Sequence, residues 1–319
     1  MSATLQLLTR NRNIVLAYVG ALLLFGVTTA FSPGFASPNH VRILLIEASF
    51  IGLVALGQTF VILGGGVDLS IPWTLTGAAI LMTLWASGQN GPLVWVIPLL
   101  LGLGVLVGLV NGLGVALLGV PPIIMTLGVN GILEGAVLIY TNGSPTAGAP
   151  ALIVTLATGK IGPVPYDVLI WLGLTAIAAI ALSVTTFGRY LYAVGTNRTV
   201  AHFSGVSIRW ITVLTYVVSG VTAVIAGILL TGYSGQSFLG EGDPYLFSSV
   251  AAVAIGGASI LGGSGHYVGT VAGALILTVL SGLLPILNLN PAALQIIYGL
   301  VIILTVSLAT VRLRREESV

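Results

Sequence analysis

Ten apolar runs, separated by short polar or Pro/Gly-rich segments, make up most of this chain. Several runs are shorter than the roughly 20 residues that a straight helix needs to cross a membrane, and one is longer. Tilted or broken helices accommodate such differences in length. The pattern therefore predicts an all-α polytopic membrane protein with about ten transmembrane helices, some of them short or broken. The runs cover residues 14–31, 41–63, 72–87, 93–118, 121–141, 167–186, 210–232, 246–261, 267–287 and 292–311.

The composition excludes a water-soluble protein. Of the 319 residues, 56% are hydrophobic and 6% are charged, whereas roughly a quarter are charged in soluble domains. The mean hydropathy is +1.11. The chain contains no cysteine, which excludes disulfides, iron–sulfur clusters and thiol catalysis. We expect a single transmembrane domain that extends over residues 1–319.

The basic residues test the number of spans, because cytoplasmic loops of membrane proteins carry an excess of Lys and Arg. Ten spans with a cytoplasmic N-terminus place eight of the ten basic residues on one side, and leave only Arg42 and Lys160 on the other. An odd number of spans would put one end of the chain on the wrong side. We therefore expect both termini in the cytoplasm. The eight cytoplasmic residues would be Arg10, Arg12, Arg189, Arg198, Arg209, Arg312, Arg314 and Arg315.

The most polar stretch between two apolar runs is residues 186–209, which form a basic cytoplasmic loop in this topology. Asn197 has the side chain of a helix N-cap, and Gly205 lies where a short helix would end in a left-handed residue. Residues 198–204 are therefore predicted to form about two turns of helix. A short capped helix in a basic loop favours a docking element, and a solvated connector explains the same residues equally well.

Two glycine-rich junctions interrupt the apolar pattern, at residues 63–70 (LGGGVDLS) and 255–265 (IGGASILGGSG). Each glycine costs about 1 kcal/mol relative to alanine in a helix, so we expect the helices to break here. Breaks within a membrane persist only where protein or water satisfies the backbone. Asp68 lies in the first junction, and an acid at this depth suggests function. Its alternative role, which we favour from the sequence, is to cap the helix that starts near Pro72.

The segments predicted to face the outside are 31–39, 141–167 and 232–245. The second is the longest and holds four prolines, and the third carries Glu241 and Asp243 and is polar enough to face water. Proline prevents simple continuation of a helix. These segments are where a soluble partner or a substrate would arrive.

No motif for chemistry on the chain itself is present. The only lysine, Lys160, is followed by isoleucine, so there is no phosphate-binding loop of the G-x-x-x-x-G-K-[ST] type, and metalloprotease and serine-hydrolase motifs are also missing. Intramembrane acids would be needed for proton coupling, and the candidates are Glu47 and Glu134. Isolated acids also form ordinary hydrogen bonds between helices. Gln58, Asn111 and Asn130 add polar groups, and Asn130 lies on the same helix face as Glu134.

Four segments together resemble one family, the membrane permeases of bacterial ABC sugar importers of the ribose and galactose type. They are GQTFVILGGGVDLS (57–70), PPIIMTLG (121–128), GRYLYAVGTNRTVAHFSGV (188–206) and AAVAIGGASILGGSGHYVGTVAGALI (251–276). They occur in the family's order, and the resemblance extends over essentially the whole chain. The chain departs from the usual pattern at Pro72, where the family has glycine, at 197–202, where it has Asn-Pro-Glu-Ala-Ala-Arg, and at Ser264, where a basic residue is common.

The resemblance implies a transport subunit without a cofactor of its own, in the bacterial inner membrane. Separate cytoplasmic ATPase subunits would bind ATP and magnesium, a second permease chain would complete the pathway, and a periplasmic or lipid-anchored binding protein would deliver a pentose or hexose sugar. No nucleic acid is expected among the partners. The alternatives are a permease for a nucleoside, an autoinducer or a branched-chain amino acid, and a proton-coupled secondary transporter. The family's coupling helix falls in the loop 187–209.

These considerations give two sets of candidate residues. The residues expected to couple to the ATPase are Gly188, Arg189, Gly195, Asn197, Arg198, Ala201 and Gly205. The residues expected in the translocation pathway or at its helix breaks are Gln58, Gly64, Gly65, Gly66, Asp68, Asn130, Glu134, Gly256 and Gly257.

Overall fold

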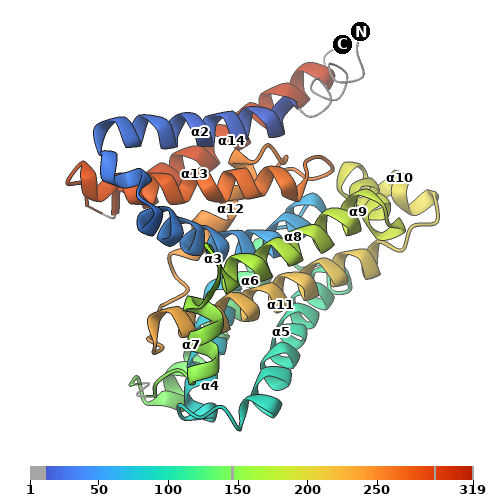
Figure 1. Cartoon of the computed structure of the whole chain (residues 1–319). Helices are drawn as coiled ribbons and strands as arrows, with labels where there is room; N and C mark the ends of the chain where they lie inside the picture. The colour runs from blue at the N-terminus through green and yellow to red at the C-terminus, as the bar shows by residue number, and fades with distance from the viewer. Residues whose placement is uncertain (1–11, 145–146, 291, 318–319) are drawn as a thin grey trace.

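A computed structural model describes residues 12–144, 147–290 and 292–317, and these residues are mostly α-helical (Figure 1). All ten apolar runs contain a helix, which confirms the predicted fold class. The ten helices are α2 (Arg12–Phe31), α3 (Pro38–Leu63), α4 (Ile71–Ala86), α5 (Leu93–Ala116), α6 (Pro122–Thr141), α8 (Tyr166–Ser183), α11 (Ile208–Ser234), α12 (Tyr245–Ile255), α13 (Tyr267–Ile286) and α14 (Ala292–Glu317). Within the described residues, seven helices are long and apolar enough to cross a membrane, α4 and α12 are shorter apolar helices, and α14 is apolar over Ala292–Ser307.

Shorter elements fill the connections. They are the 3-10 helix η1 (Pro33–Ala36), α7 (Ala151–Thr158), the strands β1 (Lys160–Ile161) and β2 (Val164–Pro165), α9 (Thr186–Thr196) and α10 (Arg198–Phe203). The outer segment 141–167 is thus more structured than the sequence suggests, because it contains α7 and the antiparallel pair β1–β2. Arg42 of α3 donates a hydrogen bond to the carbonyl of Thr158, which ties the end of α7 to the bundle.

The apolar run 246–261 is helical only as far as Ile255. Gly256 is the C-cap of α12, and Gly257 follows with φ +83°, a left-handed conformation that ends the helix. The last six residues of the run therefore form part of an irregular junction that connects α12 to α13.

Helix α11 lies at the centre of the fold and has its most extensive contacts with α5, α3 and α4. Its contact with α5 follows three glycines at intervals of four residues, Gly104, Gly108 and Gly112. A Cβ added to Gly108 would lie 2.4 Å from the Cα of Val217, so the two backbones touch. Small residues in this spacing allow helices to pack closely in a membrane, where the hydrophobic effect does not drive them together.

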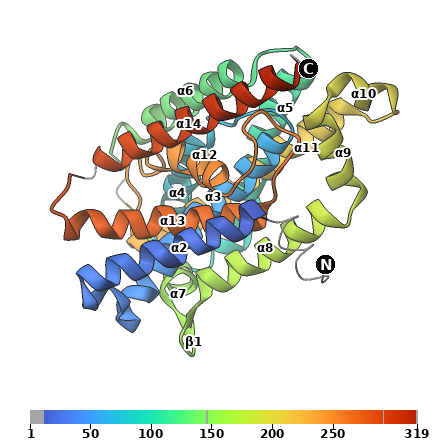
Figure 2. The same cartoon turned by 90° about the horizontal axis from the view of Figure 1, so that it is seen from above.

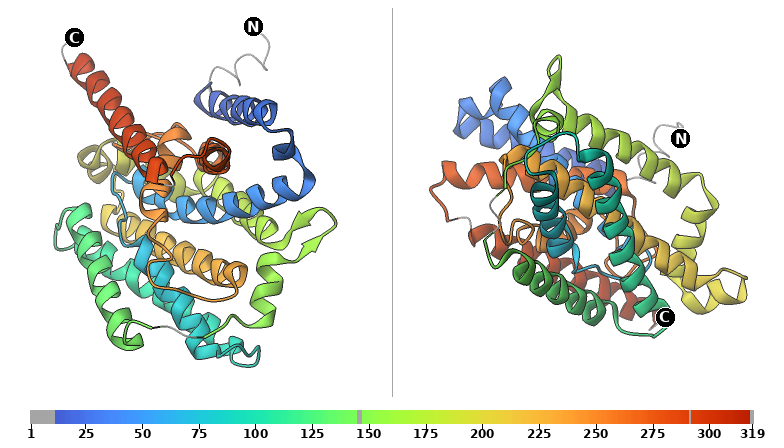
Figure 3. Two further views of the ribbon diagram at one scale, coloured as in Figure 1. Left: turned by 90° about the vertical axis from the view of Figure 1, so that its left-hand side faces the viewer. Right: turned by 90° about the horizontal axis from the view of Figure 1, so that it is seen from below.

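The exposed apolar side chains belong mainly to α2, α5, α6, α8 and α14, whereas α3 and α11 are largely buried. Leu22, Val94 and Ile139 are examples of the exposed side chains. In the views from above and from the side, α13 lies between α2 and α14 (Figures 2 and 3). An apolar rim around buried central helices is the arrangement expected for a bundle surrounded by lipid.

Helices α9 and α10 lie at the end of the bundle toward which the last turns of α14 also point (Figures 1 and 2). This arrangement agrees with a common side for the loop 187–209 and the C-terminal arginines. Arg10 lies outside the described residues, and the side chains of Arg12, Arg312, Arg314 and Arg315 are likewise not described.

We expect reporter fusions to confirm this topology. A reporter placed after Arg315 and one inserted near Thr199 should both be active in the cytoplasm, because the basic residues gather on that side. A reporter near Ala147 should be active only outside. Opposite sides for the first two reporters would contradict the ten-span arrangement.

Candidate functional site

Helices α9 and α10 form a short helical corner, and each of the two helices has an N-cap side chain. Thr185 accepts a hydrogen bond on its hydroxyl from the backbone N–H of Gly188, at 3.2 Å. Asn197 accepts one on its Oδ1 from the N–H of Val200, at 3.0 Å. These caps satisfy donors that the first turn of a helix leaves unpaired. The helix predicted at 198–204 is thus present as α10, with Asn197 as its N-cap.

The end of α10 has the hydrogen bonds of a Schellman motif. Gly205 has φ +79°, its N–H donates to the carbonyl of His202, and the N–H of Val206 donates to the carbonyl of Ala201, both at 3.0 Å. The side chain of Ala201 is buried against the bundle, whereas Phe203 is 85% exposed. Both ends of α10 are therefore fixed, and an apolar side chain is left facing outward.

The other end of the corner rests on both glycine-rich junctions. A Cβ built on Gly195 would lie 1.8 Å from the carbonyl oxygen of Leu63 and 2.5 Å from the amide nitrogen of Gly263. These two groups are hydrogen-bonded to each other: the N–H of Gly263 donates to the carbonyl of Leu63 at 3.0 Å. The end of α3, the α12–α13 junction and the end of α9 thus meet at one point, where no side chain fits.

Three side chains of the corner donate hydrogen bonds to carbonyls of the two junctions. The Tyr192 hydroxyl donates to Gly265 at 2.7 Å. The Thr196 hydroxyl donates mainly to the carbonyl of Tyr192 at 2.8 Å and shares its hydrogen with that of Gly263 at 3.4 Å. Arg198 donates through Nη2 to Gly64, also at 3.4 Å. Carbonyls at broken helix ends have no partner within their helix. The corner therefore supplies part of the hydrogen bonding that the breaks require.

Among the other candidate coupling residues, Gly188 serves a local packing role. A Cβ there would lie 2.3 Å from the carbonyl oxygen of Leu182, at the turn between α8 and α9. Arg189 is exposed and donates to the carbonyl of Val184 at 3.3 Å, on its own side of the corner. None of its hydrogen bonds among the described residues reaches the junctions.

Asp68, within the first junction, is 2% exposed and is the centre of a polar cluster. Its Oδ1 accepts hydrogen bonds from the N–H of Ser70 at 2.9 Å and from the Ser70 hydroxyl at 2.6 Å. Its Oδ2 accepts from the hydroxyl of Ser219 on α11, at 2.7 Å. Asn111 of α5 in turn donates to the Ser70 hydroxyl at 2.8 Å. The cluster joins the α3–α4 break to α5 and α11.

The expected role of Asp68 as a helix cap is wrong. Ser70 is the N-cap residue of α4, and no side chain accepts a capping hydrogen bond there. Asp68 instead bonds back onto the loop and across to α11. The three glycines do end α3 as predicted: Gly64 is its C-cap and Gly65 has φ +78°. Gly66 follows close to Tyr216 of α11.

The remaining candidate pathway residues, Asn130, Gly256, Gln58 and Glu134, lie in different surroundings. Asn130 of α6 accepts a hydrogen bond from the N–H of Trp73, in the first turn of α4, at 3.3 Å. Gly256 allows α12 to pack against α13, since a Cβ there would lie 2.5 Å from the backbone of Gly269. Gln58 is fully buried, and its amide has no hydrogen-bond partner among the described residues. Glu134 lies one turn beyond Asn130 on α6 and is close enough to Asp243 to interact with it electrostatically.

The sequence did not indicate Ser219, Tyr192 or Thr196, which make the contacts described above. A serine in an apolar run and a tyrosine in a basic loop are too common to be informative. The outer segment 232–245 also differs from its prediction, because Glu241 is buried and Gly242 packs against the backbone of Pro72. Asp243 and much of the rest of this segment are exposed, as the sequence predicts, and only the part around Glu241 and Gly242 folds inward over the start of α4.

Comparisons with known proteins agree on one family. The family described as the branched-chain amino acid transport system, permease component, matches residues 40–306. The ribose import permease protein of Haemophilus influenzae is 32% identical over 91% of each chain. That of Escherichia coli K12 is 33% identical over 90% of this chain and 91% of its own. The autoinducer 2 import system permease protein of Enterobacter sp. 638 is 33% identical over 94% of this chain and 87% of its own.

No solved structure is significantly similar to the chain. The family match covers most of the chain, including both glycine-rich junctions and the helical corner between them. The relatives are transport proteins that span almost the same length. This chain therefore belongs to the permease family of the branched-chain amino acid transport system type, as a polytopic membrane transport subunit.

Proposed function

We propose that the chain is the permease subunit of an ATP-binding-cassette importer for a neutral pentose or hexose sugar in the bacterial plasma membrane. Its 319 residues form one transmembrane permease domain. Two such chains, or this chain and a paralogue, enclose the pathway. ATP and magnesium bind to separate cytoplasmic subunits, and a sugar-binding protein delivers substrate to the outer face. Relatives that import ribose support the choice of substrate class.

The observation that carries this proposal is the contact of α9 and α10 with both glycine-rich junctions. An ATPase subunit that binds the exposed apolar side of α10, at Val200 and Phe203, would hold one end of this corner. Apolar helix faces of this kind fit a groove on a partner. The other end of the corner, at Gly195, moves only if the two breaks move with it. Closure of the ATPase dimer is then transmitted to α4 and α13, and access to the pathway alternates.

The direct test is uptake by the permease reconstituted in vesicles with and without its ATPase partner. Uptake of radiolabelled ribose should require the partner and internal ATP, and it should continue when an uncoupler removes the proton gradient. Glu47→Gln and Glu134→Gln should leave this dependence on ATP in place. Loss of uptake under the uncoupler at constant ATP would favour a proton-coupled secondary transporter instead. Autoinducer 2 is the first alternative solute to test, because a permease for it is equally similar.

The caps of α10 provide a second test. Asn197→Ala removes a cap that stabilises a helix by about 1 kcal/mol. Gly205→Val places a β-branched residue at φ +79°, which is strongly disfavoured for such residues. Both variants should lower uptake and substrate-stimulated ATP hydrolysis, and Gly205→Val should be the more severe. The permease should still insert and fold, because the substituted positions do not lie in the core.

Lys160→Ala is the control for these variants. Lys160 is exposed in β1, within the outer segment, so its substitution should not affect the ATPase. Normal transport by Gly205→Val with an intact ATPase partner would mean that the loop 187–209 is only a connector.

A further inference from the structure

A cavity of about 480 Å³ lies between α3, α11, α12, α13 and α14. Its walls combine the aromatic rings of Phe50, Tyr233, Tyr245 and Tyr298 with the polar side chains of Glu47 and Gln295. The volume is within the roughly 300–1,000 Å³ typical of small-molecule sites, and such sites are largely apolar with a few placed polar groups. Neither the corner formed by α9 and α10 nor the Asp68 cluster contributes to it.

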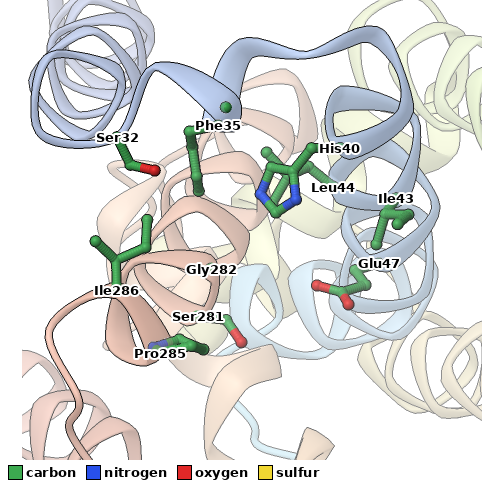
Figure 4. Close-up of a pocket in the computed structure, with 11 residues that line it drawn as sticks. Ser32, Phe35, His40, Ile43, Leu44, Glu47, Ser281, Gly282, Pro285 and Ile286 are labelled. Atoms are coloured by element: carbon green, nitrogen blue, oxygen red, sulfur yellow. The ribbon is translucent and has the colours of Figure 1, made fainter.

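A second cavity of about 400 Å³ adjoins the first and shares Glu47 and Ser281 with it. It extends toward the start of α3, where its wall includes His40 and Phe35. Figure 4 shows this second cavity, with the Glu47 carboxylate directed across it toward Ser281 on α13. Glu47, which both cavities share, is nine residues beyond Pro38 in α3, or about 14 Å along that helix from its outer end.

Several polar groups along these cavities have no partner within the protein. Among the described residues, no hydrogen bond or ion pair involves the Glu47 carboxylate, and the Nε2 atom of His40 is buried without a hydrogen bond. The hydroxyls of Tyr233, Tyr245 and Tyr298 lie close enough to Glu47 to interact with it electrostatically, yet none donates a hydrogen bond to it. Polar groups that are buried in protein normally have partners, and the half-buried Glu47 directs its carboxylate into the cavities rather than to another side chain. An intramembrane acid without one suggests a ligand.

The chemistry of these groups selects a class of ligand. A carboxylate accepts hydrogen bonds from two hydroxyls, and a tyrosine hydroxyl, an imidazole and an amide both donate and accept. Aromatic rings cover the apolar faces of a ligand with little loss of conformational freedom. A lone carboxylate with no lysine or arginine in the lining repels anions. A small, neutral, polyhydroxylated molecule satisfies all three conditions.

We propose that these joined cavities are a binding site for a neutral monosaccharide, in which Glu47 accepts hydrogen bonds from sugar hydroxyls and the tyrosines of α11, α12 and α14 flank the ring. This inference rests on the proposed function for its substrate class. It adds that the permease itself recognises the sugar, on the outer side of the glycine-rich junctions. The sugar released by a binding protein would pause here before the breaks move.

The test is binding of sugars to the purified permease in lipid nanodiscs, in the absence of any ATPase or binding protein. Saturation-transfer NMR with ribose and with galactose should give a saturable signal for the wild-type protein. Glu47→Gln should raise the dissociation constant at least tenfold, and Tyr298→Phe should raise it several-fold. Ribose 5-phosphate should not compete, because its charge is repelled by Glu47. Tyr140→Phe, an exposed tyrosine on α6, is the matched control and should bind as the wild type does.

Thermal unfolding of each variant establishes that it is folded. If Glu47→Gln does not fold, the binding measured for Tyr298→Phe decides the test. Equal binding by wild type and both variants, or no saturable signal at all, would overturn the proposal. So would a co-purifying phospholipid that saturating sugar does not displace. Because no ATPase takes part, these results are independent of the uptake experiment. ATP-dependent uptake without sugar binding to the purified permease would refute only this site. Sugar binding together with uptake that does not depend on ATP would refute only the proposed function.

Discussion

Replacing Gly195 by alanine is expected to reduce ATP-driven uptake at least tenfold. The new Cβ would lie 1.8 Å from the carbonyl oxygen of Leu63, a distance at which the backbone of one partner must move. Overpacking in a tight site costs about 1–3 kcal/mol, and here the displaced groups are the hydrogen-bonded pair of Leu63 and Gly263. The end of α9 would separate from both junctions at once, and force applied to α10 would no longer reach them.

The control for this variant is Gly128→Ala. Gly128 is also a helical glycine, on α6, but a Cβ there meets nothing within 4 Å. Uptake should be measured in vesicles at constant internal ATP, together with the amount of ATPase that co-purifies. Gly195→Ala should retain the ATPase, because the exposed apolar side of α10 that would bind it is unchanged. Sugar should no longer stimulate ATP hydrolysis. Wild-type uptake by Gly195→Ala would show that the contact between α9 and the junctions transmits nothing.

Local features of this site could be read from the sequence because they depend on neighbouring residues. Asn197 followed by a short polar segment and Gly205 predicts a capped helix, and α10 has both caps. Three consecutive glycines predict the end of α3, which ends at Leu63. The apolar runs predict the spans for the same reason, since the length and hydropathy of a span are properties of a continuous segment.

The contacts between these features could not be predicted, because they join residues far apart in the chain. The bond between Gly263 and Leu63 depends on how α12 and α13 pack against α3. Asp68 shows the same limit. Its sequence position next to Ser70 and Pro72 is typical of a helix entry, and only the packing of α11 places Ser219 against its second oxygen. The cavity around Glu47 likewise combines side chains from five helices.

The packing of Asp68 determines what its removal should do. Three donors point at this carboxylate, namely the N–H and the hydroxyl of Ser70 and the hydroxyl of Ser219. Hydrogen bonds to an ionised acceptor are stronger than neutral ones. The two hydroxyls can rotate toward other acceptors, but the backbone N–H of Ser70 cannot. Asp68 thus connects the loop after α3 to α11, and it fixes the position from which α4 starts.

Asp68→Ala is therefore expected to destabilise the permease by about 3 kcal/mol, because each buried donor left without an acceptor costs about 1–3 kcal/mol. Asp68→Asn keeps one acceptor oxygen and should lose roughly half as much. The measurement is thermal unfolding of the purified permease, with ATP-driven uptake measured in parallel. Asp243→Asn, which alters an exposed acid, should change neither. Uptake should fall in the same order as stability, with alanine below asparagine and asparagine below wild type. An Asp68→Asn protein as stable as wild type but unable to transport would contradict this role. Only the charge would then have been lost, and a charge needed for transport but not for stability indicates an ion or proton site at Asp68.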